Sequence, residues 1–145
     1  MNNQYYTPTI EEFHIGFEYE ELINFDMLSI RPNDHIDRVE WCKMNMKDIE
    51  FMSLNEIRSK LEFESIRVKY LDEKDIEDLG FIKLLANIYT LKDKVKGPIR
   101  LQYFENTNYL AVFYPGYSNT GIQLFQGIIK NKSELKVLLK QLNIS

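Results

Sequence analysis

Basic and aromatic side chains lie near one another in the second half of the chain, and their types are suited to binding chemistry. Basic groups hold phosphates, and tyrosine rings stack on nucleotide bases. The polar loop at residues 115–121 adds backbone N–H groups that can also face an anion. This pattern predicts a site for a small anionic, nucleotide-like ligand. Its candidate residues are Lys94, Lys96, Arg100, Tyr103, Tyr109, Tyr114, Tyr117 and Asn119.

The same residues also have a structural interpretation. Alternating Tyr and Phe in hairpins are typical of the core or rim of a sheet, and lysines at strand edges oppose aggregation. Long nucleic acid is disfavoured as a partner, because the chain has a formal net charge of −4 and would repel a polyanion at long range. A small-ligand site and a solvated surface therefore remain the two interpretations.

Charge is divided unevenly along the chain. Residues 1–80 carry 9 basic against 19 acidic residues, a net of −10, and residues 81–145 carry 9 against 3, a net of +6. Many of the acids lie at expected helix starts and strand flanks, where they have local structural reasons to occur. The segment from Lys92 to Arg100 has fewer such reasons. This asymmetry indicates a charged partner and does not indicate a reaction.

Signatures of metal binding and catalysis are weak. His14 and Glu18 lie four residues apart on a predicted strand, and carboxylates flank His35, but zinc sites usually have tighter spacing. The single cysteine, Cys42, follows Trp41 in an apolar segment and is expected to be a buried thiol. It has no second cysteine with which to form an internal disulfide. We expect no catalytic residue, no metal and no cofactor.

The elements that position the candidate residues are predicted to be mostly strands. Nineteen aromatic residues and only two alanines favour half-buried pleated surfaces over long helices. Apolar and polar residues alternate in a way that predicts strands at 13–19, 39–46, 66–70, 81–92, 99–104, 109–114 and 122–129. Gly97-Pro98 is expected to form a turn, and Asn106-Thr107 to form the turn of a hairpin.

Capping residues mark the predicted helix ends. Ser53 and Glu56 have the spacing of a capping box, and Asp72 suits the start of a short helix that Gly80 ends. Ser133 is the expected cap of a last helix. The leucines of that helix recur at amphipathic spacing: Leu135, Leu138, Leu139 and Leu142. The sequence therefore predicts an α+β fold, with an antiparallel β-sheet, short helices and a C-terminal amphipathic helix packed on the sheet.

Length and hydropathy set the remaining expectations. A chain of 145 residues fits one compact domain, residues 1–145, with a single core. No apolar run approaches the roughly 20 residues that span a bilayer, and no signal-peptide pattern opens the chain. We therefore expect a cytoplasmic protein that has no membrane contact.

Three segments of the chain carry a resemblance: PTIEEFHIGFEYE, SLNEIRSKLEFESIRVKYLDEKDIEDLGF and IIKNKSELKVLLKQL. They are similar to segments of a family of small uncharacterised proteins that phages and prophages of Bacteroidetes bacteria encode. The resemblance covers both ends and the middle of the chain. It implies a protein made in the cytoplasm of an infected bacterial cell, and it identifies no catalytic residue.

These observations order three classes of function. The first is a non-enzymatic phage-type binding protein that sequesters a small anionic, nucleotide-like ligand as a counter-defence factor. The alternative is a protein–protein interaction module that acts on a host or phage protein through its acidic and basic faces, as a monomer or a homo-oligomer. An enzyme comes third, because no catalytic motif stands out.

Overall fold

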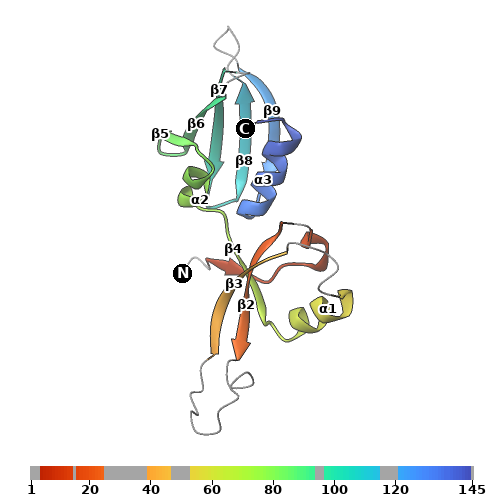
Figure 1. The fold of residues 1–145 in the computed structure, drawn as a ribbon. Helices are drawn as coiled ribbons and strands as arrows, with labels where there is room; N and C mark the ends of the chain where they lie inside the picture. The colour runs from red at the N-terminus through yellow and green to blue at the C-terminus, as the bar shows by residue number, and fades with distance from the viewer. Residues whose placement is uncertain are drawn as a thin grey trace. The chain divides into compact units, whose positions relative to one another are not determined.

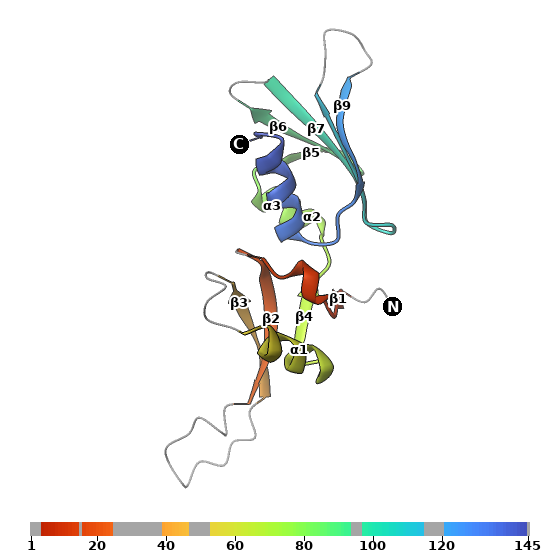
Figure 2. The ribbon, with the colours of Figure 1, turned by 90° about the vertical axis from the view of Figure 1, so that its right-hand side faces the viewer.

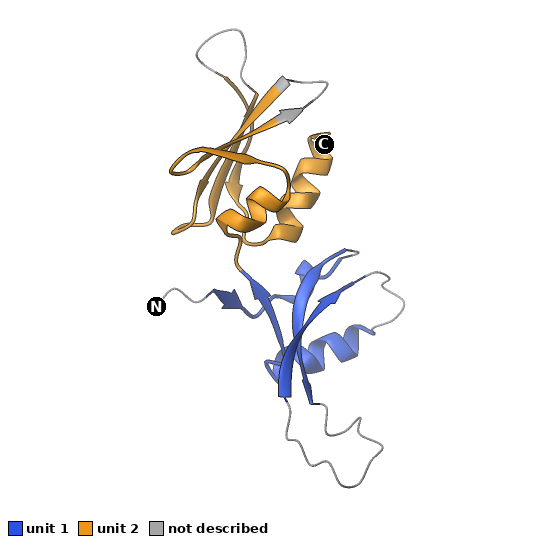
Figure 3. Ribbon diagram, turned by 60° about the vertical axis from the view of Figure 1, so that its left-hand side comes forward, with its two compact units in different colours: residues 1–69 blue, residues 70–145 orange. Residues whose placement is uncertain are grey.

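The computed structural model describes residues 4–14, 16–24, 39–46, 53–93, 97–114 and 121–144. The chain divides into two compact units, residues 1–69 and residues 70–145 (Figure 3). Each unit has its own antiparallel sheet and its own cluster of buried apolar residues. The structure thus has two clusters of buried apolar residues where the sequence led us to expect a single core. That residues 1–145 form one compact domain stays a prediction.

The first unit is a four-stranded sheet with one α-helix (Figure 1). Its strand order is β1-β4-β2-β3. Its elements are β1 (Tyr5–Tyr6), the 3-10 helix η1 (Ile10–Glu12), β2 (Glu18–Asn24), β3 (Val39–Asn45), α1 (Leu54–Glu62) and β4 (Ile66–Lys69). Ser53 caps α1, because its hydroxyl accepts a hydrogen bond from the Glu56 N–H at 3.3 Å. The Glu56 carboxylate accepts one from the Ser53 N–H at 2.7 Å. The predicted capping box is confirmed.

The core of the first unit lies between α1 and one face of its sheet. Its buried members are Phe17, Tyr19, Met46, Ile57, Ile66 and Val68. Ile57 is the buried residue that α1 contributes, whereas Leu54, the first residue of the helix, is exposed. The Lys60 ammonium of α1 donates a hydrogen bond to Glu21 of β2 at 2.6 Å, which ties the helix to the sheet.

The opposite face of this sheet holds a cation between two aromatic rings. The central carbon of the Arg67 guanidinium lies 3.9 Å from the centroid of the Tyr5 ring and 4.1 Å from that of Trp41. Its Nε donates a hydrogen bond to Glu20 at 2.8 Å. Because β1 has only two residues and pairs with β4, the ring contact to Tyr5 helps to hold this short strand on the sheet.

The second unit is a five-stranded antiparallel sheet with strands in sequence order, β5-β6-β7-β8-β9. Its elements are α2 (Glu73–Asp78), β5 (Ile82–Leu85), β6 (Ile88–Asp93), β7 (Gly97–Phe104), β8 (Tyr109–Tyr114), β9 (Ile122–Ile128) and α3 (Lys132–Gln141). Both helices lie on the same side of the sheet (Figure 2). Each strand is therefore joined to the next by a turn or loop, which keeps most of the contacts local in sequence.

Capping explains where the two helices of this unit begin and end. Asp72 accepts a hydrogen bond from the Asp75 N–H at 2.9 Å, and Gly80 follows the helix with a φ of +90°, so both predicted ends of α2 are confirmed. For α3 the predicted cap was wrong. Buried Asn131 accepts from the Glu134 N–H at 2.9 Å, and Ser133 is the second residue of the helix.

The core of the second unit lies between its helices and the sheet. Ile99, Leu101 and Tyr103 of β7 alternate toward the helices and pack with residues from every other part of the unit. The leucine stripe is confirmed, since Leu135, Leu138 and Leu139 are buried and Leu142 packs against the same cluster. The C-terminal helix therefore packs on the sheet as predicted.

One tyrosine joins the start of the second unit to the middle of its sheet. The Tyr103 hydroxyl lies 2.7 Å from the carbonyl oxygen of buried Leu71, to which it donates a hydrogen bond. The Leu71 N–H donates to the Lys130 carbonyl at 2.7 Å. Both backbone groups of Leu71 are thus satisfied inside the unit, and the segment before α2 is fixed to β7 and to the end of β9.

Two predicted boundaries were wrong for physical reasons. The strand expected at 13–19 begins at Glu18, because the alternation before it comes from packed rings such as Phe13 and Phe17, whose centroids lie 5.0 Å apart. Gly97 and Pro98 do not form a turn, since they pair with β6 at the start of β7. The predicted turn at Asn106-Thr107 is confirmed, and the residue with positive φ in it is Asn108, at +53°.

The fold class is confirmed as α+β with antiparallel sheets. The strand at 39–46 and the hairpin of β7 and β8 also lie where the sequence predicts them. The segment at 81–92, predicted as one strand, forms two strands, β5 and β6, joined by a turn at Ala86 and Asn87.

Replacement of Tyr103 by Phe should destabilise the protein by about 1–3 kcal/mol at pH 7, because the buried Leu71 carbonyl loses its donor. Burial, followed by the nearby Glu105 and Asp72 carboxylates, raises the pKa of Tyr103 well above its ordinary value. The contribution of Tyr103 to the free energy of unfolding is therefore complete below pH about 10. It decreases as the pH rises further, by about 1.4 kcal/mol per pH unit.

Urea unfolding of the wild type and of Tyr103→Phe between pH 8 and pH 11 measures both effects. The advantage of the wild type should shrink above pH 10, because only the wild type then gains an ionised tyrosine at this position on unfolding. Tyr19 and Tyr89, whose pKa values are also raised by burial, are present in both proteins and cancel in the difference. An advantage that is constant with pH would contradict the buried position of Tyr103.

Candidate functional site

The second unit has a sheet face that its helices leave uncovered, which we call the open face. Along β7 the side chains that alternate with the core residues Ile99, Leu101 and Tyr103 must point away from α2 and α3 (Figure 2). Large apolar side chains on this face are exposed, with Ile82, Leu85 and Ile128 at 64%, 65% and 64% of their full surface. An exposed apolar sheet face of this kind is typical of a binding surface.

Strand register arranges the open face in three rows that cross the sheet. The arginine row is Ile82, Thr90, Arg100, Phe113 and Gln123. The glutamine row is Leu85, Ile88, Gln102, Ala111 and Gln126. The aromatic row is Phe104, Tyr109 and Ile128. Neighbours within a row are about 5 Å apart, and successive rows are about 7 Å apart.

Arg100 is the only charged side chain in these three rows, in the part of the chain that the structure describes. The carboxylates of the unit whose side chains the structure describes lie elsewhere: on α2 and at its cap, in the turn after β7 and on α3. No carboxylate of the described rows competes for Arg100, which is exposed. Alternation along the strands has therefore separated one guanidinium from the acids of an otherwise negative protein, and a small anion can approach it on this side.

Aromatic rings lie on both sides of the glutamine row. Phe113 is the direct cross-strand neighbour of Arg100. Two rows from Arg100, the rings of Phe104 and Tyr109 pack with their centroids 6.2 Å apart and an angle of 52° between their planes. The Tyr109 hydroxyl donates a hydrogen bond to Gln126 at 3.1 Å, which fixes the ring against the glutamine row. The face can thus offer flat rings, amide groups and one cation to the same ligand.

The structure brings together only part of the predicted ligand site. Arg100 and Tyr109 both lie on the open face, whereas Tyr103 is buried on the opposite face and makes structural hydrogen bonds. Tyr114 is half-buried and packs against the core. The remaining members of the predicted set lie outside the described residues: Lys94, Lys96, Tyr117 and Asn119.

Sequence reasoning missed Phe104, Phe113 and Gln102 as members of this face. The signal was present as alternation, because Arg100, Gln102 and Phe104 recur every second residue. This alternation is informative only if it is known which of the two sets of side chains faces the helices. A shift of one residue in the strand register exchanges the two sets. The number of apolar residues does not decide this, since both sets of β7 and β8 contain aromatic rings.

The residues considered for metal binding and catalysis are His14, Cys42 and those around His35. Among the described residues, no group of three or more His, Cys, Asp or Glu side chains is placed to hold a metal ion. His14 packs edge-on against Phe17 at 5.5 Å, and Cys42 is a half-buried free thiol in β3. The loop that contains His35 lies outside the described residues.

Comparison of the chain with protein-family models, with curated proteins and with solved structures finds no match. Among the described residues, no helix has the length and apolar character needed to cross a membrane.

Two neighbouring alanine substitutions should have opposite consequences for stability. Leu101→Ala removes a side chain with no exposed surface and should cost about 2–5 kcal/mol of unfolding free energy. Arg100→Ala removes an exposed side chain and should change stability by only about 0.5 kcal/mol. Urea unfolding curves of both variants measure the difference, and similar losses would show that the two faces of β7 have been assigned wrongly.

Proposed function

We propose that this chain is a non-enzymatic binding protein whose open face captures a small anionic, nucleotide-like ligand. The observation that carries the proposal is the position of Arg100, an exposed guanidinium beside Phe113 on a face whose described side chains include no carboxylate. A guanidinium binds phosphate through paired, charge-assisted hydrogen bonds. A ring next to it can stack on the base of the same ligand, which contributes about 1–3 kcal/mol per base.

The other rows suit the remaining groups of such a ligand. Gln102 and Gln126 belong to the row beside Arg100, and their amides can donate to and accept from the edges of a base. Phe104 and Tyr109 lie one row further and can stack on a second ring. Binding of this kind requires no general base or metal, which is why we propose capture without catalysis.

The cellular role is a separate part of the proposal. The three segments that resemble a phage and prophage family support a protein made in the cytoplasm of an infected bacterium. A small anionic nucleotide signal of host defence is a ligand whose capture would benefit a phage. We therefore propose a counter-defence role for the open face.

Thermal unfolding in the presence of linear and cyclic nucleotides tests ligand capture. A true ligand at about a hundred times its Kd should stabilise the wild type by about 2.7 kcal/mol. Arg100→Gln should lose most of this stabilisation, because the phosphate loses its guanidinium. Lys140→Gln is the matched control, since it removes the same charge from the exposed surface of α3 on the other side of the sheet. Capture is wrong if no nucleotide stabilises the wild type, or if both variants respond alike.

A second candidate function is a protein–protein interaction module that acts on a host or phage protein. The observation that favours it is the exposure of Ile82, Leu85 and Ile128 at the two edges of the open face. A surface rich in aromatic and aliphatic side chains with one arginine resembles the centre of a protein interface. The partner segment should be apolar and should carry a carboxylate that meets Arg100.

Site-specific photocrosslinking from Leu85 in bacterial lysate tests this second function. We expect a crosslinked protein that excess unlabelled wild type displaces and that excess Leu85→Lys does not. A photocrosslinker at Lys140, on α3, is the control position and should give no such product. Equal displacement by both competitors would contradict a protein interface on the open face.

A further inference from the structure

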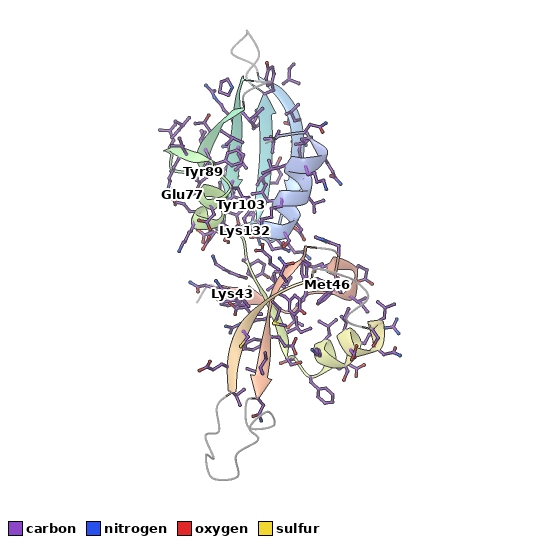
Figure 4. The ribbon with its side chains drawn as sticks, in the orientation of Figure 1. Lys43, Met46, Glu77, Tyr89, Tyr103 and Lys132 are labelled. Atoms are coloured by element: carbon purple, nitrogen blue, oxygen red, sulfur yellow. The ribbon has the colours of Figure 1, made fainter. Side chains whose placement is uncertain are left out.

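A concave pocket of about 410 Å³ lies in the second unit and has chemistry unlike that of the open face. Three segments line it: the β5–β6 turn with Ala86 and Asn87, the end of β7 with the following turn, and the first turn of α2 with Glu73. Figure 4 shows the side chains of Glu77, Tyr89 and Tyr103 close to one another in this part of the unit. The volume is within the range of pockets for small molecules.

The lining of this pocket contains acids and no bases. Its carboxylates are Glu73 and Glu105, and no Lys, Arg or His is among its lining residues. Glu73 is already engaged, because the Lys83 ammonium binds it at 2.5 Å. Glu105 is exposed and, within the described residues, takes part in no ion pair. Glu105 is therefore the carboxylate that is available to a ligand.

The carboxylates near the pocket contribute to the raised pKa values of two of its tyrosines. Burial is the main reason for the raised pKa of Tyr89, and the Glu73, Glu77 and Glu105 carboxylates raise it further against the opposing effect of Lys83. The pKa of Tyr103 is raised first by burial and then by Glu105, Asp72 and Asp75. More than one carboxylate therefore lies close enough to these two rings to raise their pKa values.

The remaining lining groups would surround a cation with rings and polar groups. Tyr89, Tyr103 and Phe104 contribute aromatic surface, whose negative faces attract cations. The Tyr103 hydroxyl proton is used in its bond to Leu71, which leaves the oxygen able to accept a hydrogen bond. Asn87, Asn106 and Thr107 add neutral polar groups at the entrance.

We propose that this pocket binds a compact organic cation, a primary amine or a guanidinium, with the Glu105 carboxylate as its ionic partner. The ammonium or guanidinium group would lie against Glu105, and its alkyl chain would lie along Tyr89 and Phe104. This site differs from the site of anion capture, because its ionic partner is Glu105 and not Arg100 and its ligand has the opposite charge, although Phe104 borders both.

Titration of the ¹⁵N-labelled full chain with putrescine and with agmatine, followed by NMR, tests the proposal. Both probes should shift the amide signals of Asn87, Asn106 and Thr107 at physiological salt, and Glu105→Gln should weaken the binding about tenfold or more. Glu62→Gln is the matched control, since it removes one exposed carboxylate at the end of α1 in the first unit. It should bind like the wild type.

Three results would overturn the cation site. They are an absence of shifts at these amides, equal weakening by Glu105→Gln and Glu62→Gln, and equal shifts with the neutral analogue 1,4-butanediol. Glu105 is exposed in a turn, so its replacement should leave the fold intact, and the dispersion of the NMR spectrum verifies this directly. Failure here leaves nucleotide capture standing, because that proposal depends on Arg100 and on anionic probes.

Discussion

The second unit depends on one hydrogen bond between a tyrosine in its sheet and the backbone at its start. Tyr103 donates to Leu71, and Leu71 in turn donates to Lys130, so three distant parts of the unit meet at one buried residue. The helix α2 begins directly after this point, and α3 begins directly after Lys130. Lys132 forms an ion pair with Asp78 at 2.8 Å, which joins the start of α3 to the end of α2. The placement of both helices on the same side of the sheet follows from this junction.

That placement determines what the other side of the sheet can do. With α2 and α3 on one side, the acids of α2 and their counter-ions are kept there as well. The open face receives the alternate residues of the same strands, among them Arg100, and the described side chains of its rows include no acid. Within this unit, the acids of α2 thus lie on the helix side of the sheet and Arg100 lies on the open face. Anion capture and cation binding are proposed for two surfaces of one small unit that differ in their charged groups, Arg100 and Glu105, and that meet at Phe104.

The sequence predicted the elements better than their orientation. Short-range chemistry was sufficient for the capping box at Ser53, for the start of α2 at Asp72 and for the leucine stripe of α3, because each depends on residues within two turns. It failed where packing imitates a local pattern, as at Phe13 and Phe17, whose rings pack without forming a strand. It also failed at Ser133, since Asn131 supplies the same kind of acceptor two residues earlier.

The candidate site was predictable only in part, for a related reason. A basic and aromatic hairpin was visible in the sequence, but Tyr103 and Arg100 lie on opposite faces, because they are three residues apart on one strand. Which residues share a face depends on strand register and on the position of the helices, and both are long-range properties. The pocket near Glu105 is formed by three separate segments, so no contiguous pattern in the sequence could indicate it.

The cation between the rings of Tyr5 and Trp41 has a practical consequence for observing this molecule. Trp41 is the only tryptophan of the chain, and it belongs to the first unit. Its indole lies against the Arg67 guanidinium, so its fluorescence depends on a contact that exists only while β1, β3 and β4 are assembled. Indole emission therefore reports on residues 1–69 alone, whereas buried phenol absorbance at alkaline pH includes Tyr103 of the second unit. The cooperativity of the two halves can thus be read from a single unlabelled sample by comparing two wavelengths.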